Sequence, residues 1–214
     1  MLKRILMLLM YSSLIMNLEA QDAFKPSTYL GINAGTNLSL VSFTPSVNQD
    51  LLTSPSFGII LRHVSEPHIG LQLEVNFAGK GWKEKLDSIG SYKRNLETLD
   101  IPIMAVFIAG SRTVRFAFAL GPYVSYLRHE KETINIADTL DYRAYYNKTL
   151  VNNLEFGFTG GLGIELHTKL GVFGIRASYS HSLTNLFPLN VSEYYFSGSR
   201  NQVINAGISY FIKL

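Results

Sequence analysis

The chain has 214 residues, 47% of them hydrophobic, and a formal net charge of only +3 at pH 7. It contains no cysteine, which excludes disulfides, CxxC redox chemistry, thiolate metal sites and a lipid-anchored lipoprotein. The near balance of 19 Lys+Arg against 16 Asp+Glu also argues against a nucleic-acid partner, which favours a clustered basic face.

The first twenty residues have the layout of a secretory signal peptide. Lys3 and Arg4 form a short basic region, residues 5–16 form an apolar core, and Leu18-Glu19-Ala20 is a plausible cleavage site. This pattern predicts a signal peptide over residues 1–20. The length of residues 21–214 suits a single domain.

Apolar and polar residues alternate along eight later stretches, so each stretch would place its apolar side chains on one face of a sheet. Charges, Gly or Asn interrupt every later apolar run before it reaches the ~18 residues that a transmembrane helix needs. Eight is the smallest usual number of strands in a transmembrane barrel. The predicted strands cover residues 30–38, 57–62, 69–77, 99–107, 114–126, 154–166, 173–180 and 202–214.

The last of these stretches carries its apolar face to the final residue of the chain. Ile204, Ile208, Ile212 and Leu214 share one face, and Asn205 lies on the other. A soluble sandwich usually ends in a polar tail. The pattern therefore favours the closing strand of an outer-membrane barrel.

The connections between predicted strands alternate between short and long. Short turns at residues 65–67, 110–112 and 169–170 separate long polar segments at residues 40–54, 79–95, 129–153 and 184–199. Bacterial barrels have short periplasmic turns and long extracellular loops. The alternation predicts that both termini lie in the periplasm.

The composition of the two faces indicates which one is outside. The polar faces hold many Gly, Ala and Ser and few charges, as in a crowded lumen, whereas a solvated exterior would be rich in Lys and Glu. The apolar faces are large and aromatic, with Trp82, Phe107, Tyr126, Phe173 and Tyr210 near strand ends, where interfacial girdles lie. We therefore predict an all-β fold, an eight-stranded antiparallel up-and-down transmembrane β-barrel in the outer membrane. A soluble calycin-like barrel or a sandwich is the alternative.

The inward faces carry charges of nearly balanced sign. An eight-stranded barrel has an interior just wide enough for its own side chains, so these charges should pair and fill the lumen. A path for protons or solutes between them is the alternative. The predicted lumen network consists of Arg62, Glu74, Asp100, Arg115, Glu155, Glu165 and Arg176.

Two prolines fall inside predicted strands, where a proline removes a ladder donor. If the short turn at residues 110–112 pairs Gly110 with Thr113, then Pro102 on the first strand lies opposite Gly121 on the second and beside Pro122. This register predicts one shared bulge or kink around Gly121. A lateral opening of the barrel wall is the functional alternative.

The long loops are candidates for specific contacts. A locally basic segment could meet the phosphates of lipopolysaccharide, and aromatic residues at the outer mouth could contact a protein or pack on one another. The basic candidates are Lys80, Lys83 and Lys85. The aromatic candidates are Tyr142, Tyr145, Tyr146, Tyr194 and Tyr195.

No arrangement of residues demands catalysis or a metal. His63 with Ser65, and His181 with Ser182, contain the residue types of a hydrolase site, but their spacing does not require them to cooperate. The cluster of His129, Glu130 and Glu132 is typical of a solvated loop. We expect neither an enzyme nor a cofactor or metal site.

Two short motifs resemble those of the PorT-like outer-membrane β-barrel proteins. They are Leu99-Asp100-Ile101-Pro102-Ile103 and, after a turn, Gly121-Pro122-Tyr123-Val124-Ser125-Tyr126-Leu127. The family often has Tyr where this chain has Leu99, and Lys where it has Val106. The resemblance implies an outer-membrane protein whose named relative is associated with protein secretion by the type IX pathway.

From this resemblance we expect, first, a component or accessory of protein secretion. Its expected partners are secretion-machinery proteins, in addition to outer-membrane lipid. A surface-binding, adhesion or envelope-structural barrel that acts through its loops is the alternative. A lipid-modifying or proteolytic small barrel is the third class.

Overall fold

The computed structural model describes residues 24–86, 90–136, 146–147, 150, 152–188 and 196–214. The predicted signal peptide and the candidates Tyr142, Tyr145, Tyr194 and Tyr195 lie outside these residues, as does the side chain of Lys85. Within the described part of the chain, no helix is long and apolar enough to cross a membrane.

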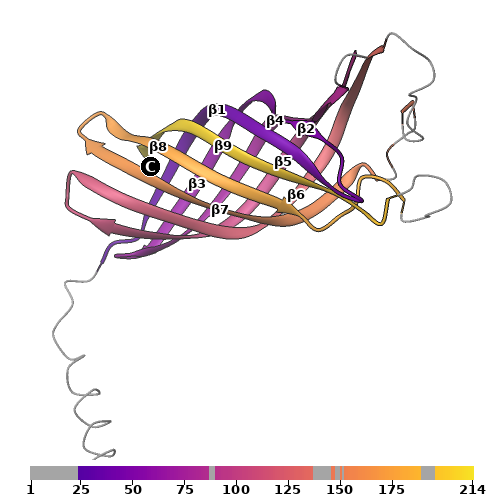
Figure 1. The fold of residues 1–214 in the computed structure, drawn as a ribbon. Coiled ribbons are helices and arrows are strands. Elements are labelled where there is room, and N and C mark those ends of the chain that lie inside the picture. The colour runs from indigo at the N-terminus through magenta and orange to yellow at the C-terminus, as the bar shows by residue number, and fades with distance from the viewer. Residues whose placement is uncertain (1–23, 87–89, 137–145, 148–149, 151, 189–195) are drawn as a thin grey trace, which may run out of the picture.

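The fold is a ring of eight long antiparallel strands, which confirms the predicted class (Figure 1). Each long strand pairs with its neighbours in chain order, and β1 pairs with β9 to complete the ring. The short strand β2 adds to the end of β4. The strands are β1 (Ser27–Thr44), β2 (Gln49–Asp50), β3 (Leu52–Glu66), β4 (Ile69–Leu86), β5 (Gly90–Gly110), β6 (Val114–Ile136), β7 (Leu154–Thr168), β8 (Gly171–Ser182) and β9 (Gly198–Lys213).

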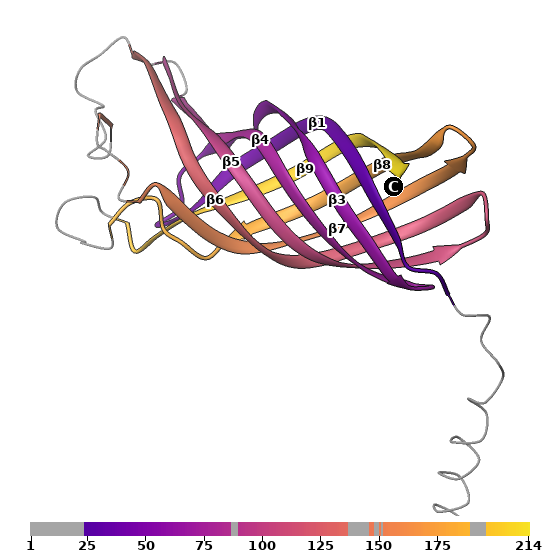
Figure 2. The same cartoon turned by 180° about the vertical axis from the view of Figure 1, so that it is seen from behind.

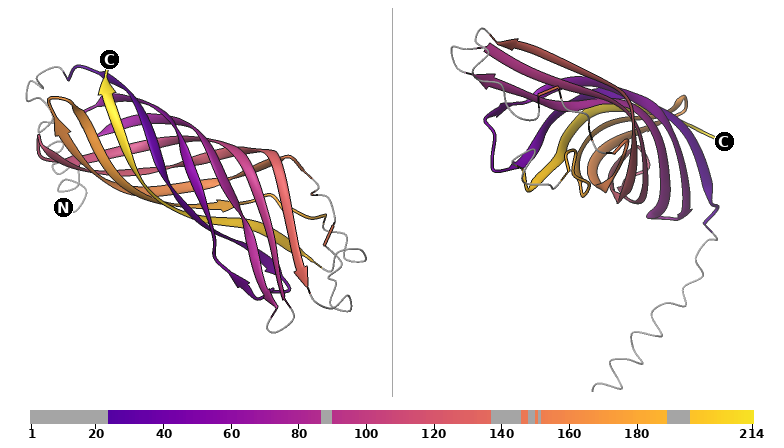
Figure 3. Two further views of the ribbon diagram at one scale, coloured as in Figure 1. Left: turned by 90° about the horizontal axis from the view of Figure 1, so that it is seen from above. Right: turned by 90° about the vertical axis from the view of Figure 1, so that its right-hand side faces the viewer.

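Alternation along each strand separates an apolar exterior from a polar interior. On β9, Ile204 and Ile208 are exposed on the outer surface, whereas Asn201 and Ser209 are buried inside. The strands cross the barrel obliquely, as Figure 3 shows, so each inward side chain meets residues from distant strands. Strand tilt of this kind is required to close a sheet into a barrel.

Three short turns lie at one end of the barrel, which we call the turn end, together with the start of β1 and the C-terminus. They follow β3, β5 and β7. Gly110 and Gly171 border two of these turns with φ of 138° each, a backbone conformation that favours glycine. The opposite end is called the loop end.

Three segments predicted as long loops contain strand: residues 40–54 and 79–95 are mostly strand, and residues 129–153 begin with the end of β6. β4 continues to Leu86 and β5 begins at Gly90, so most of the predicted loop 79–95 is a hairpin, and β6 likewise continues to Ile136. The prediction was wrong because outward positions beyond the apolar band need not be apolar, and Lys83 and Lys93 conceal the alternation there. The extended β4, β5 and β6 project past the other strands at the loop end (Figure 2).

The register between β5 and β6 differs from the prediction by two residues. Gly110 pairs with Arg115, and Pro102 therefore lies opposite Tyr123. The turn is longer than predicted, with the Ser111 amide donating to the carbonyl oxygen of Val114 at 2.8 Å. A shift of two keeps every side chain on its predicted face, because the side-chain period of a strand is two.

Replacing Gly207 with leucine is expected to disrupt ring closure. Gly207 pairs with Gly35, and a Cβ on Gly207 would lie 2.5 Å from the carbonyl oxygen of Ala34. Overpacking of this kind costs roughly 1–3 kcal/mol. The heat-modifiable folded form in detergent gels should be reduced in Gly207→Leu. Ala206→Leu, on the exposed outer face, should fold like the wild type, and equal loss in both variants would contradict this account.

Candidate functional site

The lumen is filled by two groups of charged and polar side chains. The first, the Glu74 group, is held together by inward-facing residues of β3, β4, β7 and β8. Arg176 binds both carboxylate oxygens of the fully buried Glu74, at 2.7 and 2.9 Å. Arg62 joins Glu165 at 2.6 Å and donates to Gln72 at 2.7 Å. Gln72 donates in turn to Glu74, so the group forms one continuous hydrogen-bonded chain.

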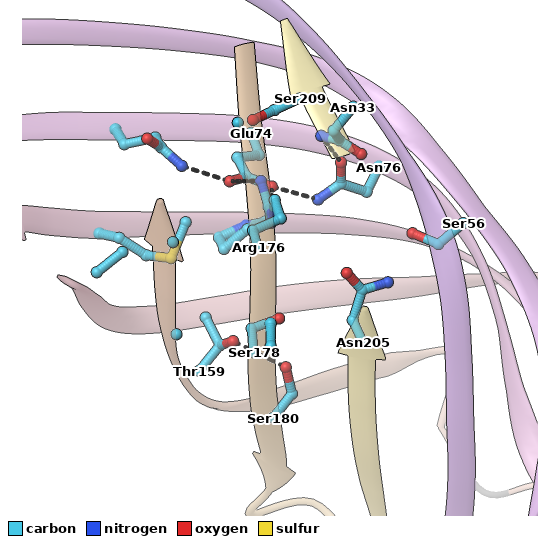
Figure 4. A pocket seen from close by; sticks show the side chains of 18 of the residues that line it. Asn33, Ser56, Glu74, Asn76, Thr159, Arg176, Ser178, Ser180, Asn205 and Ser209 are labelled. Carbon is cyan, nitrogen blue, oxygen red and sulfur yellow. Dashed lines mark hydrogen bonds and ion pairs between the residues drawn. The ribbon is translucent and has the colours of Figure 1, made fainter. Parts of the chain in front are cut away.

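Figure 4 shows Glu74 and Arg176 side by side at the centre of this arrangement. Asn76 donates to the second Glu74 oxygen at 2.9 Å and accepts from Asn33 at 2.8 Å. An ionised carboxylate buried inside a protein needs both a counter-charge and hydrogen-bond donors, and Glu74 has both. The Glu74 group therefore forms a barrier across the lumen.

The second group is centred on Lys80 and lies nearer the loop end. The Lys80 Nζ lies 3.1 Å from Glu155 Oε1 and 3.5 Å from Asp100 Oδ1, and it donates to Ser125 at 2.9 Å. Tyr123 and Asn201 donate to Glu155 at 2.6 and 2.7 Å. Lys80 was predicted as a loop contact, but it is buried inside the barrel. The alternation of inward and outward side chains along β4 continues through residue 80. Extending this alternation past the apolar stretch would have placed Lys80 inside the barrel.

These contacts bring together six of the seven predicted lumen charges. The seventh, Arg115, joins neither group: its Nε donates to the Ser111 carbonyl oxygen at 3.3 Å. Arg115 lies opposite Glu165 in the β6–β7 ladder, but Arg62 already binds that carboxylate. The cause is the position of Arg115 at the start of β6, where it faces the mouth of the barrel instead of its packed centre.

Alongside the two groups, the lumen retains a cavity of about 100 Å³ whose lining includes members of both. It is lined by small polar side chains, including Ser56, Thr159, Ser178 and Asn205 (Figure 4). A water molecule occupies about 30 Å³ in the liquid, so this space suits a few waters. It does not suit a continuous pore.

The loop end is closed by a cluster of buried side chains, which we call the aromatic plug. Trp82, expected in an interfacial girdle, is fully buried here, and its indole nitrogen donates to Glu84 at 2.8 Å. Tyr92 and Tyr146 stack with ring centroids 4.0 Å apart. The plug consists of Val41, Phe43, Trp82, Tyr92, Leu96, Tyr146, Leu150, Leu186, Phe187 and Phe196.

Residues from segments predicted as loops join or border the plug, and packing of the loop aromatics on one another was one of the two predicted alternatives. The Arg94 guanidinium lies 5.7 Å from the Trp82 ring centroid and 5.3 Å from that of Phe187, and it pairs with Glu130 and Glu132. Tyr146 donates to Glu84 at 3.1 Å, so this candidate contact residue serves the packing of the loop end itself. Of the basic candidates, Lys83 alone has a described, exposed side chain.

The wall near the two prolines differs from the predicted single bulge. Pro102 points inward and is buried, whereas Pro122 is exposed on the outer face. The β5–β6 ladder skips residues 103 and 104, and the β4–β5 ladder skips residues 101 and 102. A Cβ on Gly121 would lie 1.9 Å from the Ile103 carbonyl oxygen, so close backbone approach requires glycine there. The register shift itself lies farther along, between Glu97 and Thr98.

The histidine and serine candidates for catalysis have ordinary structural partners. His63 Nδ1 lies 3.0 Å from the Thr28 hydroxyl. His181 stacks on Tyr179, and Ser182 donates to the Thr184 carbonyl oxygen at 3.0 Å. Among the described residues, no three His, Cys, Asp or Glu side chains are grouped to hold a metal.

A model of the outer membrane protein beta-barrel domain family matches residues 20–188. The chain belongs to this family. Its apolar exterior and closed strand ring are therefore those of an outer-membrane β-barrel, as the sequence predicted. A comparison with curated proteins gave no match.

Several solved structures are similar to this chain over most of their length. The attachment invasion locus protein Ail of Yersinia pestis is 13% identical, with coverage of 86% of this chain and 98% of that one and a TM-score of 0.43. The outer membrane protein OprG of Pseudomonas aeruginosa is 11% identical, covering 87% and 95%, with a TM-score of 0.47. Neisserial surface protein A is 11% identical, covering 87% and 99%, with a TM-score of 0.43.

Replacing Glu74 with glutamine is expected to destabilise the barrel by about 3–5 kcal/mol, because it leaves the Arg176 charge without its partner in the lumen. Urea unfolding in lipid vesicles can be followed by fluorescence of Trp82, the only tryptophan. The double variant Glu74→Gln/Arg176→Met should recover part of the loss. Glu97→Gln is a matched control on an exposed position. A Glu74→Gln barrel as stable as the control would show that the ion pair contributes little.

Proposed function

We propose that this protein is a non-conducting outer-membrane barrel that acts through contacts at its loop end, as a component or accessory of protein secretion. The observation that carries this proposal is the filled lumen. The Glu74 group, the Lys80 group and the aromatic plug follow one another along the barrel interior. A barrel with no free passage works through its surfaces.

The loop end is suited to such contacts. The extended β4, β5 and β6 project from the ring, and the aromatic plug stacks Tyr146 on Tyr92 and Phe196 on Phe43. A surface that is already ordered binds a partner with a smaller entropic penalty than a mobile one. We place this end outside the cell and both termini in the periplasm, in keeping with the long connections at the loop end and short turns at the other.

The resemblance to PorT-like proteins supports secretion as the process served. Its two motifs surround the wall segment in which both ladders of β5 are interrupted, so they coincide with an unusual feature of the barrel. Asp100, within the first motif, is also a partner of Lys80. The motif residues thus have structural roles in the wall and the lumen.

Deleting the gene should abolish or strongly reduce export of secreted cargo, and the tagged wild-type protein should copurify with secretion-machinery proteins. Tyr146→Ala should weaken that association, because it removes the stacking on Tyr92 and the hydrogen bond to Glu84. Tyr179→Ala, on the exposed outer wall, is the matched control. Normal secretion in the deletion strain would refute the secretion role, and loss of adhesion or envelope integrity alone would favour the alternative.

That alternative, binding of lipopolysaccharide or another surface ligand, is favoured by one observation. Lys83 and Lys93 lie directly opposite each other on the outward face of the β4–β5 extension, and both are exposed. Like charges at opposed positions are destabilising, which an anionic ligand would relieve. Asp50, opposite Lys83 on β2, offsets only part of this charge.

The double variant Lys83→Gln/Lys93→Gln should bind lipopolysaccharide several-fold more weakly than the wild type at low salt, with little change in barrel stability. The measurement is binding of purified lipopolysaccharide to the barrel in uncharged detergent as a function of salt, because exposed charges are screened. Arg112→Gln/Lys169→Gln removes the same charge from exposed positions at the turn end and should have no effect. Equal weakening by both double variants would exclude a specific contact at the loop end.

A further inference from the structure

The lumen opens at the turn end into a second cavity of about 260 Å³, which we call the turn-end cavity. Its size is close to the lower limit for small-molecule sites. We propose that it binds a small organic oxyanion, a phosphate or carboxylate group attached to an apolar body. The Glu74 group lies deeper in the lumen, so the turn end is the shortest route of entry for a ligand.

The cavity has an excess of positive charge. Lys25, Arg62, Arg115 and Lys213 line it, whereas Glu165 is its one carboxylate-bearing side chain. Arg62 and Glu165 neutralise each other at 2.6 Å. Three cationic side chains are then left around the cavity: Lys25 and Lys213 are exposed at its mouth, and Arg115 is half-buried.

Within the described part of the chain, Lys25, Arg115 and Lys213 have no carboxylate within 4.0 Å. The Arg115 Nε donates to the Ser111 carbonyl oxygen, which leaves its terminal nitrogens as donors for a ligand. A guanidinium presents these donors in the fork geometry that matches phosphate and carboxylate. Arg115 is therefore the main anion contact in this proposal.

The cavity also contains polar atoms without hydrogen-bond partners among the described residues. The buried Nε2 of His167 and Oε2 of Glu165 have no hydrogen bond, and they face each other at 3.5 Å as a loose ion-pair contact. Buried polar atoms without a hydrogen bond are rare in folded proteins, and here they leave polar capacity at the cavity that a ligand or water could use. The Glu165 carboxylate repels an anion, but its charge is already matched by Arg62, so the net field of the cavity remains positive.

Most of the remaining lining residues are apolar, which is why the proposed ligand carries an organic body. Val64 and Ile108 come from one buried hydrophobic cluster, and Val172 and Phe211 come from another. An inorganic ion would leave this surface uncovered. An oxyanion with an attached ring or short chain would satisfy the cationic and the apolar parts of the cavity together.

Calorimetric titration of the purified barrel in uncharged detergent at low salt can test this site, with inorganic phosphate and phenyl phosphate as probes. Phenyl phosphate should bind with a stoichiometry near one and about tenfold more tightly than inorganic phosphate, because its ring covers apolar lining. Arg115→Gln should weaken phenyl phosphate binding at least tenfold. Arg128→Gln, on the same strand β6 but exposed near the loop end, should bind like the wild type.

Three results would overturn the proposal: no binding of phenyl phosphate to the wild type at millimolar concentration, equal binding by Arg115→Gln, or equal weakening by Arg128→Gln. Heat-modifiable migration verifies that each variant is folded. The same titration in nanodiscs identifies the source of the anion. If the site takes a lipid headgroup, replacing zwitterionic lipid with phosphatidylglycerol should weaken phenyl phosphate binding in the wild type but not in Arg115→Gln. Unchanged binding of phenyl phosphate assigns the site to a soluble anion.

Discussion

Closure of the hydrogen-bonded ring between β1 and β9 is the constraint on which the rest of the molecule depends. In a bilayer, every backbone amide and carbonyl must be paired within the protein, and a closed barrel achieves this without a free edge. Closing the ring with eight strands makes the interior so narrow that side chains must fill it. Charged residues inside then have to neutralise one another, as Arg176 and Glu74 do. The filled lumen follows from the number of strands.

The same constraint explains how much of the fold the sequence could predict. Where lipid surrounds the barrel, outward residues such as Ile204 and Ile208 must be apolar, and the alternation is easy to recognise. Beyond the apolar band, outward positions are free to carry Lys83 and Lys93, so the extended hairpin looked like a loop. The inward residues Lys80, Trp82 and Glu84 kept the parity of β4 throughout. That parity was the signal that could have revealed both the buried lysine and the aromatic plug.

The composition of the lumen was predictable, but the pairing of its charges was not. Parity determines which face a side chain occupies, whereas a partner across the barrel depends on strand tilt and stagger, which residue spacing does not encode. Arg62 meets Glu165, which lies 103 positions away in the chain. A register error of two residues left every face correct and still moved Pro102 from opposite Gly121 to opposite Tyr123. For the same reason, sequence alone could not show that Arg115 stands outside the ion-pair groups.

The two ends of the barrel balance their charges in different ways, and the two proposals made above rest on this difference. At the loop end, Arg94 is packed against aromatic rings and paired with Glu130 and Glu132, so its charge contributes to rigidity. At the turn end, Arg115 borders an open cavity with a hydrogen bond to one carbonyl oxygen. Because the Glu74 group separates the two ends, a ligand in the turn-end cavity need not pass through the barrel. The two proposals are therefore compatible, because one places a partner at the loop end and the other a small anion at the turn end.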